Sequence, residues 1–135
     1  MKLTENFSLN EFACKTGEPV PQKYLGAVQK LAENLQVLRD EVNKDSKSEK
    51  TIKINSAYRN AAHNQKIGGK PNSQHLYAKA ADIKVKGLKP EKVAEIIEQL
   101  IADGKMREGG IGIYDTFVHY DIRGTKARWD YRKQE

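Results

Sequence analysis

Two segments of the chain repeat their apolar residues with the period of an α-helix. Within residues 22–42, leucines and valines recur at steps of three, four and seven, and a similar pattern follows Pro90 and ends before Gly104. Such spacing gathers apolar side chains on one side of a helix. Proline suits a first helical turn and glycine a helix end. We therefore predict two amphipathic helices, with the longest helix of the chain over residues 22–42.

Four other segments have the pattern of strands. In residues 51–55 and 81–85, isoleucine or valine stands at every second position, which is the period of a strand with one buried face. Residues 109–114 and 117–122 also read as strands, joined by a turn at Asp115 and Thr116. The polar stretch 43–50 is predicted to be a surface loop.

Shorter signals complete the predicted fold. Ser8 and Glu11 form a capping box, so a short helix should carry Phe12 inward. A second short helix is expected over residues 60–67, capped by its first residue, Asn60. Helices gather early in the chain and strands pair later through short connections, which favours an α+β fold with helices packed on a small, mostly antiparallel sheet. We expect a single domain over residues 1–135.

The composition limits the chemistry that the chain can support. With 135 residues, 38% of them hydrophobic, one core can form without disulfides. Cys14 is the only cysteine, which excludes an intramolecular disulfide and a multi-cysteine zinc site. We interpret it as a small buried residue. No segment resembles a signal peptide or a membrane span, so we expect a protein made in the cytoplasm that has no membrane partner.

The charge leaves two interpretations open. Lysine and arginine number 24 against 18 acidic residues, a net charge of +6. This excess either keeps the protein soluble or attracts a polyanion such as nucleic acid or cell wall. The lysines are spread along the chain, and no element combines a basic cluster with interleaved aromatic residues. We therefore expect no nucleic-acid partner.

Two pairs of residues could take part in metal chemistry. His75 and Asp82 are seven residues apart, which on a helix would separate them by about 10.5 Å along the axis, too far to share a metal. A loop leading into a strand can bring them together, and Asp82 is then either solvated or part of a site. On the strand 117–122, His119 and Asp121 share a face roughly 7 Å apart. One of them could bind a metal while the other acts as a general acid or base. Alternatively, both belong to an ordinary polar strand face.

Two further residues are candidates for binding a ligand. Arg59 follows the first strand and is well placed to hold a carboxylate with its planar fork, although an ordinary surface arginine would fit the same position. Trp129, the only tryptophan, is expected to pack a terminal segment.

Several fragments occur together and in order. They are SAYR at 56–59, SQH at 73–75 with AADI at 80–83, GIGIY at 110–114, FVHYDIRG at 117–124 and ARW at 127–129, after a leader FSLNEFAC at 7–14. This series closely resembles the M15 family of zinc D-Ala-D-Ala carboxypeptidases, in the small single-domain branch that includes phage and bacterial murein peptidases. The resemblance covers nearly the whole chain, and its S-x-H-x6-D element followed by H-x-D is specific.

The resemblance implies one zinc ion per chain, held by His75, Asp82 and His119, with the fourth position left to water. It also implies a fold related to lysostaphin-type peptidases and to the hedgehog signalling domain.

The chain departs from the family pattern at two positions. The larger M15 enzymes carry a catalytic glutamate where this chain has Thr116, so Asp121 is the natural substitute as general base. The usual glycine of the histidine motif is Ala78, which matters only if the backbone there needs a positive φ.

We therefore expect a zinc-dependent peptidase that acts on peptidoglycan stem peptides, either as a carboxypeptidase that releases D-Ala or as a murein endopeptidase such as a phage endolysin. In this hypothesis Asp121 takes a proton from the attacking water. Arg59 holds a substrate carboxylate or stabilises the developing oxyanion. Ser73 and Gln74 line the cleft or support His75.

The alternative is a noncatalytic, zinc-stabilised module that binds cell wall on the same scaffold, and the threonine at position 116 favours it. In either case we expect a monomer that reaches the wall only if it is exported or released.

Overall fold

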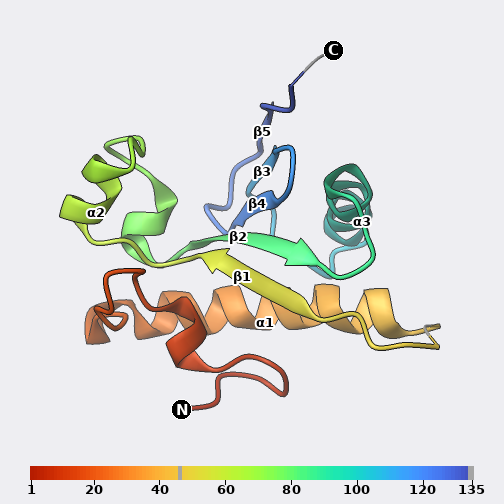
Figure 1. Cartoon of the computed structure of the whole chain (residues 1–135). Coiled ribbons are helices and arrows are strands. Elements are labelled where there is room, and N and C mark those ends of the chain that lie inside the picture. Colours follow the sequence, from red (N-terminus) through yellow and green to blue (C-terminus); the bar gives the residue numbers. More distant parts are fainter. Residues whose placement is uncertain (46, 134–135) are drawn as a thin grey trace.

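One sheet of five strands organises the molecule (Figure 1). The computed structural model describes residues 1–45 and 47–133. The strands are β1 (Ile52–Ser56), β2 (Ala80–Val85), β3 (Gly110–Ile113), β4 (Val118–Asp121) and β5 (Ala127–Asp130). Their order is β1-β2-β4-β3-β5, and all neighbours are antiparallel except β3 and β5, which are parallel. The predicted α+β fold with a mostly antiparallel sheet is confirmed.

Two amphipathic helices supply most of the helical core. They are α1 (Leu25–Asn43), which runs below β1 in Figure 1, and α3 (Pro90–Ala102), which lies beyond the end of β2. The two helices contact each other and share one apolar cluster with the strands. The periodicity at 22–42 was therefore a correct helix signal, although its first turn is the 3-10 turn η2 (Gln22–Tyr24).

The short predicted helices also form, with the expected caps. The first is the 3-10 helix η1 (Leu9–Phe12), where the backbone N–H of Ser8 donates to Glu11 at 2.7 Å and Phe12 is fully buried. The second is α2 (Ala61–Lys66), whose cap Asn60 accepts from the backbone of His63 at 2.7 Å. A further turn, η3 (Gln74–Tyr77), and strand β5 were not predicted. The predicted loop 43–50 includes residue 46, which lies outside the described residues.

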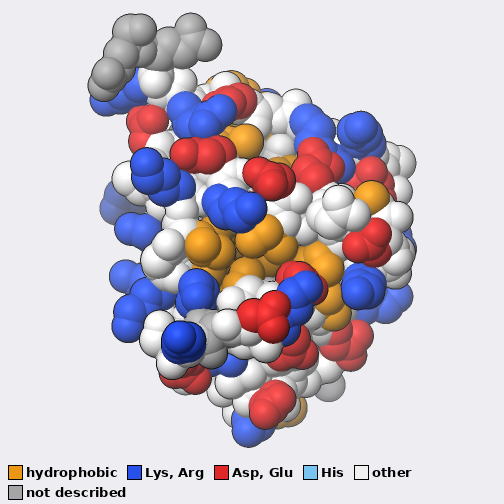
Figure 2. Space-filling view, turned by 90° about the vertical axis from the view of Figure 1, so that its right-hand side faces the viewer, with side chains coloured by type: hydrophobic (Ala, Val, Ile, Leu, Met, Phe, Trp, Pro, Cys, Tyr) orange, Lys and Arg blue, Asp and Glu red, His pale blue; other side chains and the backbone are white. Residues whose placement is uncertain are grey.

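The surface mixes charges of both signs. Figure 2 shows the side on which α3 lies, with acidic and basic side chains interspersed around a small apolar area. Within residues 1–45 and 47–133, no helix has the length and apolar character needed to cross a membrane.

Candidate metal centre

One row of residues crosses the sheet from edge to edge. The strand register pairs Ser56 with Asp82, Asp82 with His119, His119 with Gly112, and Gly112 with Trp129. Residues paired across neighbouring strands present their side chains on the same face. Asp82 and His119 therefore meet on the face opposite the apolar positions of β2, as the alternation of that strand predicts.

His75 reaches this row from η3, the turn that leads into β2. The backbone N–H of His75 donates to Ser73 Oγ at 3.2 Å, which caps the turn. Ala78 ends it in the left-handed conformation, with φ of 58° and ψ of 31°. This conformation costs a residue with a Cβ atom about 1 to 2 kcal/mol. Position 78 thus has a positive φ, the condition under which the glycine of the family pattern would matter.

The three predicted ligands converge on one point. His75 Nε2 lies 3.3 Å from Asp82 Oδ1, and His119 Nδ1 lies 3.1 Å from the same oxygen. One ligand atom from each residue falls within 4.8 Å of the other two. Zinc bonds of about 2.0 to 2.1 Å in a tetrahedron place ligand atoms about 3.3 Å apart. Two imidazoles and one carboxylate at these separations fit a zinc ion.

Each histidine is held through its other ring nitrogen. His75 Nδ1 lies 2.7 Å from the backbone oxygen of Ala57, and His119 Nε2 lies 2.7 Å from Asp121 Oδ2. A carbonyl or carboxylate oxygen at this distance accepts the ring N–H, so in the neutral imidazoles the lone pairs of His75 Nε2 and His119 Nδ1 are left to bind a metal ion beside Asp82. Such contacts fix the orientation of metal-binding imidazoles.

Burial and hydrogen bonding move the pKa values of the cluster in different directions. Burial lowers the pKa of His75. Burial alone would also lower the pKa of His119, but hydrogen bonds to Asp121 and Asp82 raise it. Burial alone would raise the pKa of Asp82, but the two imidazoles, which donate hydrogen bonds to it when they are protonated, hold that pKa well below its usual range. Asp82 is therefore an ionised carboxylate, ready to bind a cation.

Asp121 lies behind His119 and is fully buried. Its Oδ1 accepts from the backbone N–H of Gly110 at 2.9 Å, and its two oxygens accept from the guanidinium of Arg123 at 2.9 and 2.7 Å. The prediction that Asp121 shares a face with His119 is correct. Its contact with the cluster, however, runs through the far nitrogen of the His119 ring.

Arg59 lies beside the cluster on the other side. Its Nη2 is 3.2 Å from Asp82 Oδ2, while Nε and Nη1 donate to Ser56 at 3.2 Å and Asn64 at 3.3 Å. Arg59 thus binds Asp82 Oδ2, whereas both histidines contact Asp82 Oδ1. Burial lowers its pKa, although the charge of Asp82 opposes that effect.

A cleft of about 810 Å³ opens onto the cluster. His75, Asp82 and His119 line it together with the predicted Arg59, Ser73 and Gln74. Part of its wall is aromatic, and basic and small residues also contribute to it. The aromatic members of that wall are Tyr114, Phe117, Trp129 and Tyr131. Thr116 is exposed and does not contribute to the lining.

Trp129 packs the terminal strand β5 against the sheet, as expected, and it also lines the cleft, which its sequence position did not indicate. It lies on strand β5 at the cleft, with its ring centroid 4.9 Å from that of His119. A Cβ atom at Gly112 would lie 2.2 Å from Trp129 Nε1, so the indole occupies the space that a side chain at 112 would fill. The signal was present in GIGIY, because Gly110 and Gly112 leave two gaps on one face of a strand.

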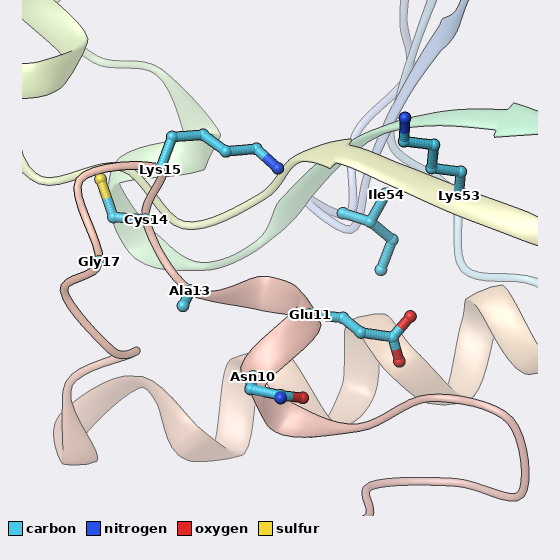
Figure 3. Close-up of a pocket in the computed structure, with 8 residues that line it drawn as sticks. All are labelled: Asn10, Glu11, Ala13, Cys14, Lys15, Gly17, Lys53 and Ile54. Atoms are coloured by element: carbon cyan, nitrogen blue, oxygen red, sulfur yellow. The ribbon is translucent and has the colours of Figure 1, made fainter.

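A second, smaller hollow lies beside η1. It has a volume of about 370 Å³, and Figure 3 shows Glu11 and Lys53 in its wall. Cys14 also lines it and is buried, as predicted. Glu11 is its only lining carboxylate and no histidine lines it. This hollow therefore offers no metal-binding set comparable to the one in the larger cleft.

Gly112→Ala tests the packing of the tryptophan. The new methyl group must displace the indole, and we expect a loss of roughly 1 to 3 kcal/mol in the free energy of unfolding, as for other overpacked sites. Urea unfolding followed by fluorescence measures it, since Trp129 is the only tryptophan. Gly26→Ala is the matched control, because nothing lies within 4 Å of its added Cβ atom and alanine favours a helix. Equal stability of the two variants would contradict the packing.

Comparison with known proteins bears on this site. No curated protein matches the chain. The family model described as Peptidase M15 matches residues 5–121, a range that contains Arg59 and all three residues of the metal-binding cluster. The match covers most of the chain, so the protein belongs to the peptidase M15 family.

Proposed function

We propose that this protein is a zinc-dependent peptidase that cleaves peptidoglycan stem peptides. One observation carries the proposal: two imidazoles and an ionised carboxylate line an open cleft, with one nitrogen of each imidazole 3.1 to 3.3 Å from the same carboxylate oxygen and all three ligand atoms within 4.8 Å of one another. Catalytic zinc sites combine three such protein ligands with a position open to water and substrate.

The residues of the cluster and those around it would have different roles in the reaction. Bound zinc would polarise the scissile carbonyl and make water a stronger nucleophile at neutral pH. His75, Asp82 and His119 would hold the ion. Arg59 supplies a cation at the edge of the cleft for a substrate carboxylate or for the oxyanion, and Ser73 supports the turn that carries His75.

The charge of the cleft supports an acidic peptide as substrate. Among its described lining residues are four cations, Arg59, Lys70, Arg123 and Arg128, and one carboxylate, Asp82. Arg123 and Arg128 also pair with carboxylates outside the lining. Stem peptides of peptidoglycan carry free carboxylates, which such a cleft attracts. We propose that the protein acts there as a monomer, without a nucleic-acid or membrane partner, on wall that it reaches by export or release.

The role of Asp121 stays a prediction. The sequence suggested a general base that acts directly on water. Its full burial and its contact with His119 Nε2 favour a positioning role instead, in which it presents His119 Nδ1 to the metal.

A noncatalytic wall-binding module is the second candidate. It is favoured by the absence of any carboxylate besides Asp82 among the described residues that line the cleft. Digestion of purified muropeptides by the zinc-loaded protein separates the two functions. We expect shortened peptides. Zinc-loaded protein that binds muropeptides but leaves them intact would favour the module.

Arg59→Lys tests how the cleft recognises its substrate. The planar guanidinium can hold a carboxylate through two hydrogen bonds, whereas an ammonium supplies a point charge. We expect a roughly tenfold or greater loss in kcat/KM on peptides with a free C-terminal carboxylate, and a smaller loss on the same peptides with an amidated end. Steady-state kinetics on both peptides measures the difference. An equal loss on both would assign Arg59 to the oxyanion or to the support of Asp82, and would favour an endopeptidase.

A further inference from the structure

Tyr114 brings a hydroxyl group into the metal-binding cleft. It follows β3 directly, two residues after Gly112, and its side chain lines the same cleft as His75, Asp82 and His119. Its ring stacks on Phe117, with the centroids 4.4 Å apart and the planes 9° from parallel. The stacking limits the movement of the ring, so its hydroxyl keeps a defined place at the cleft.

The hydroxyl of Tyr114 has one hydrogen bond and an unused donor. Trp129 Nε1 donates to Tyr114 Oη at 3.0 Å. An indole N–H can only donate, so the phenol serves here as acceptor and its own hydrogen remains available. Within residues 1–45 and 47–133, no acceptor for that hydrogen lies within hydrogen-bond distance. A free hydroxyl hydrogen in a cleft can donate a hydrogen bond to an oxygen atom of a bound ligand.

Trp129 holds that donor in a fixed direction. Its indole fills the space above Gly112, packs against the ring of His119 and lies under the guanidinium of Arg123, 5.7 Å from the centroid. The tryptophan thus connects the row of metal-binding residues to the tyrosine hydroxyl. Electrostatics keep the hydroxyl protonated, because burial and the charge of Asp82 raise the pKa of Tyr114 above its ordinary value despite the opposing hydrogen bond from Trp129.

We propose that Tyr114 is a further catalytic residue, whose hydroxyl donates a hydrogen bond to the oxyanion that forms on the scissile carbonyl, and that Trp129 is its positioning residue. This inference rests on the proposed peptidase function. Water adds to the carbonyl carbon, the electron pair of the C=O double bond moves to oxygen, and the tyrosine hydrogen stabilises the new negative charge without being transferred. Fixed donors aimed at such a charge are among the strongest contributors to catalysis.

Tyr114→Phe removes the donor and leaves the stacked ring. We expect kcat on a stem peptide to fall roughly 10²-fold, as when an oxyanion donor is lost elsewhere, with KM changed less than threefold and zinc content unchanged. Calorimetry supplies a second readout. The variant should lose a similar factor in affinity for a phosphinic peptide analogue, which imitates the tetrahedral intermediate, but little for the product peptide. Tyr77→Phe, an exposed tyrosine outside the cleft lining, is the matched control.

Trp129→Phe removes the indole N–H and keeps an aromatic ring against His119. It should lower kcat by less than Tyr114→Phe does, and it should have no further effect on kcat in a chain that already carries Tyr114→Phe. Such non-additivity is expected when one residue acts through the other. If Trp129 had a purely structural role, Trp129→Phe would lower kcat by the same factor in the wild type and in Tyr114→Phe.

The outcomes separate this inference from the function on which it rests. If the wild-type protein cleaves no peptide with zinc bound, the proposed function fails. If the wild type cleaves and Tyr114→Phe keeps kcat and analogue affinity within threefold, the role of Tyr114 is wrong. A rise in KM with unchanged kcat would assign the hydroxyl to ground-state substrate binding and would also overturn it.

Discussion

Replacing His119 by glutamine should leave the purified protein without bound zinc. His119 supplies one of only three ligand atoms that the described part of the chain brings together, and two ligands rarely hold a structural or catalytic zinc ion. Elemental analysis after dialysis should give about one zinc per chain for the wild type and a small fraction of that for the variant. His63→Ala is the matched control, because His63 lies on α2 and is not part of the cluster.

Thermal unfolding gives an independent view of the same change. A ligand present at 1,000 times its dissociation constant stabilises the native state by about 4 kcal/mol. Added zinc should therefore raise the melting temperature of the wild type and of His63→Ala, and leave His119→Gln unmoved. Full zinc occupancy in a folded His119→Gln protein would show that the ligand set is wrong.

Asp121→Asn should weaken zinc binding roughly 10- to 100-fold, the usual effect of losing a carboxylate that orients a metal-binding histidine. At saturating zinc we expect turnover to stay within about tenfold of the wild type, because the buried carboxylate contacts the cluster only through His119. Competition with a chromogenic chelator measures the affinity, and kinetics at increasing zinc concentrations measures the turnover.

Unchanged zinc affinity together with a large loss of turnover in Asp121→Asn would instead support Asp121 as the general base. Removing a general base while the metal site stays intact lowers turnover roughly 10²- to 10⁴-fold and does not change zinc affinity. Circular dichroism controls for folding, since the substitution weakens the ion pair with Arg123, whose guanidinium lies 2.7 Å from Asp121 Oδ2.

Much of the site was accessible from the sequence because its residues lie on strands of regular period. The alternation of residues 81–85 placed Asp82 on the face away from Ile83 and Val85, and the alternation of residues 117–122 placed His119 and Asp121 together. The register that brings Asp82 opposite His119 joins residues 37 positions apart. Strand alternation alone does not determine that pairing, and only the family resemblance pointed to it.

The rest of the site depends on features without a local pattern. Strand β5 pairs in parallel with β3, and a strand of four residues near the end of the chain has too short a pattern to be recognised. Trp129 reaches His119 only because Gly112 lies between them in the register. The burial of Asp121 follows from the guanidinium of Arg123 and the backbone of Gly110, which meet it only in the folded sheet.

The central claim is that the cluster of His75, Asp82 and His119 binds zinc and that this zinc makes the protein a peptidase. Its most direct test is to measure zinc content and muropeptide cleavage on one preparation, before chelation, after removal of the chelated metal, and after return of one equivalent of zinc. We predict about one zinc per chain and cleavage at the start, loss of both together, and recovery of both together. Cleavage that persists in metal-free protein, or a fully zinc-loaded protein that cleaves no muropeptide, would contradict the claim.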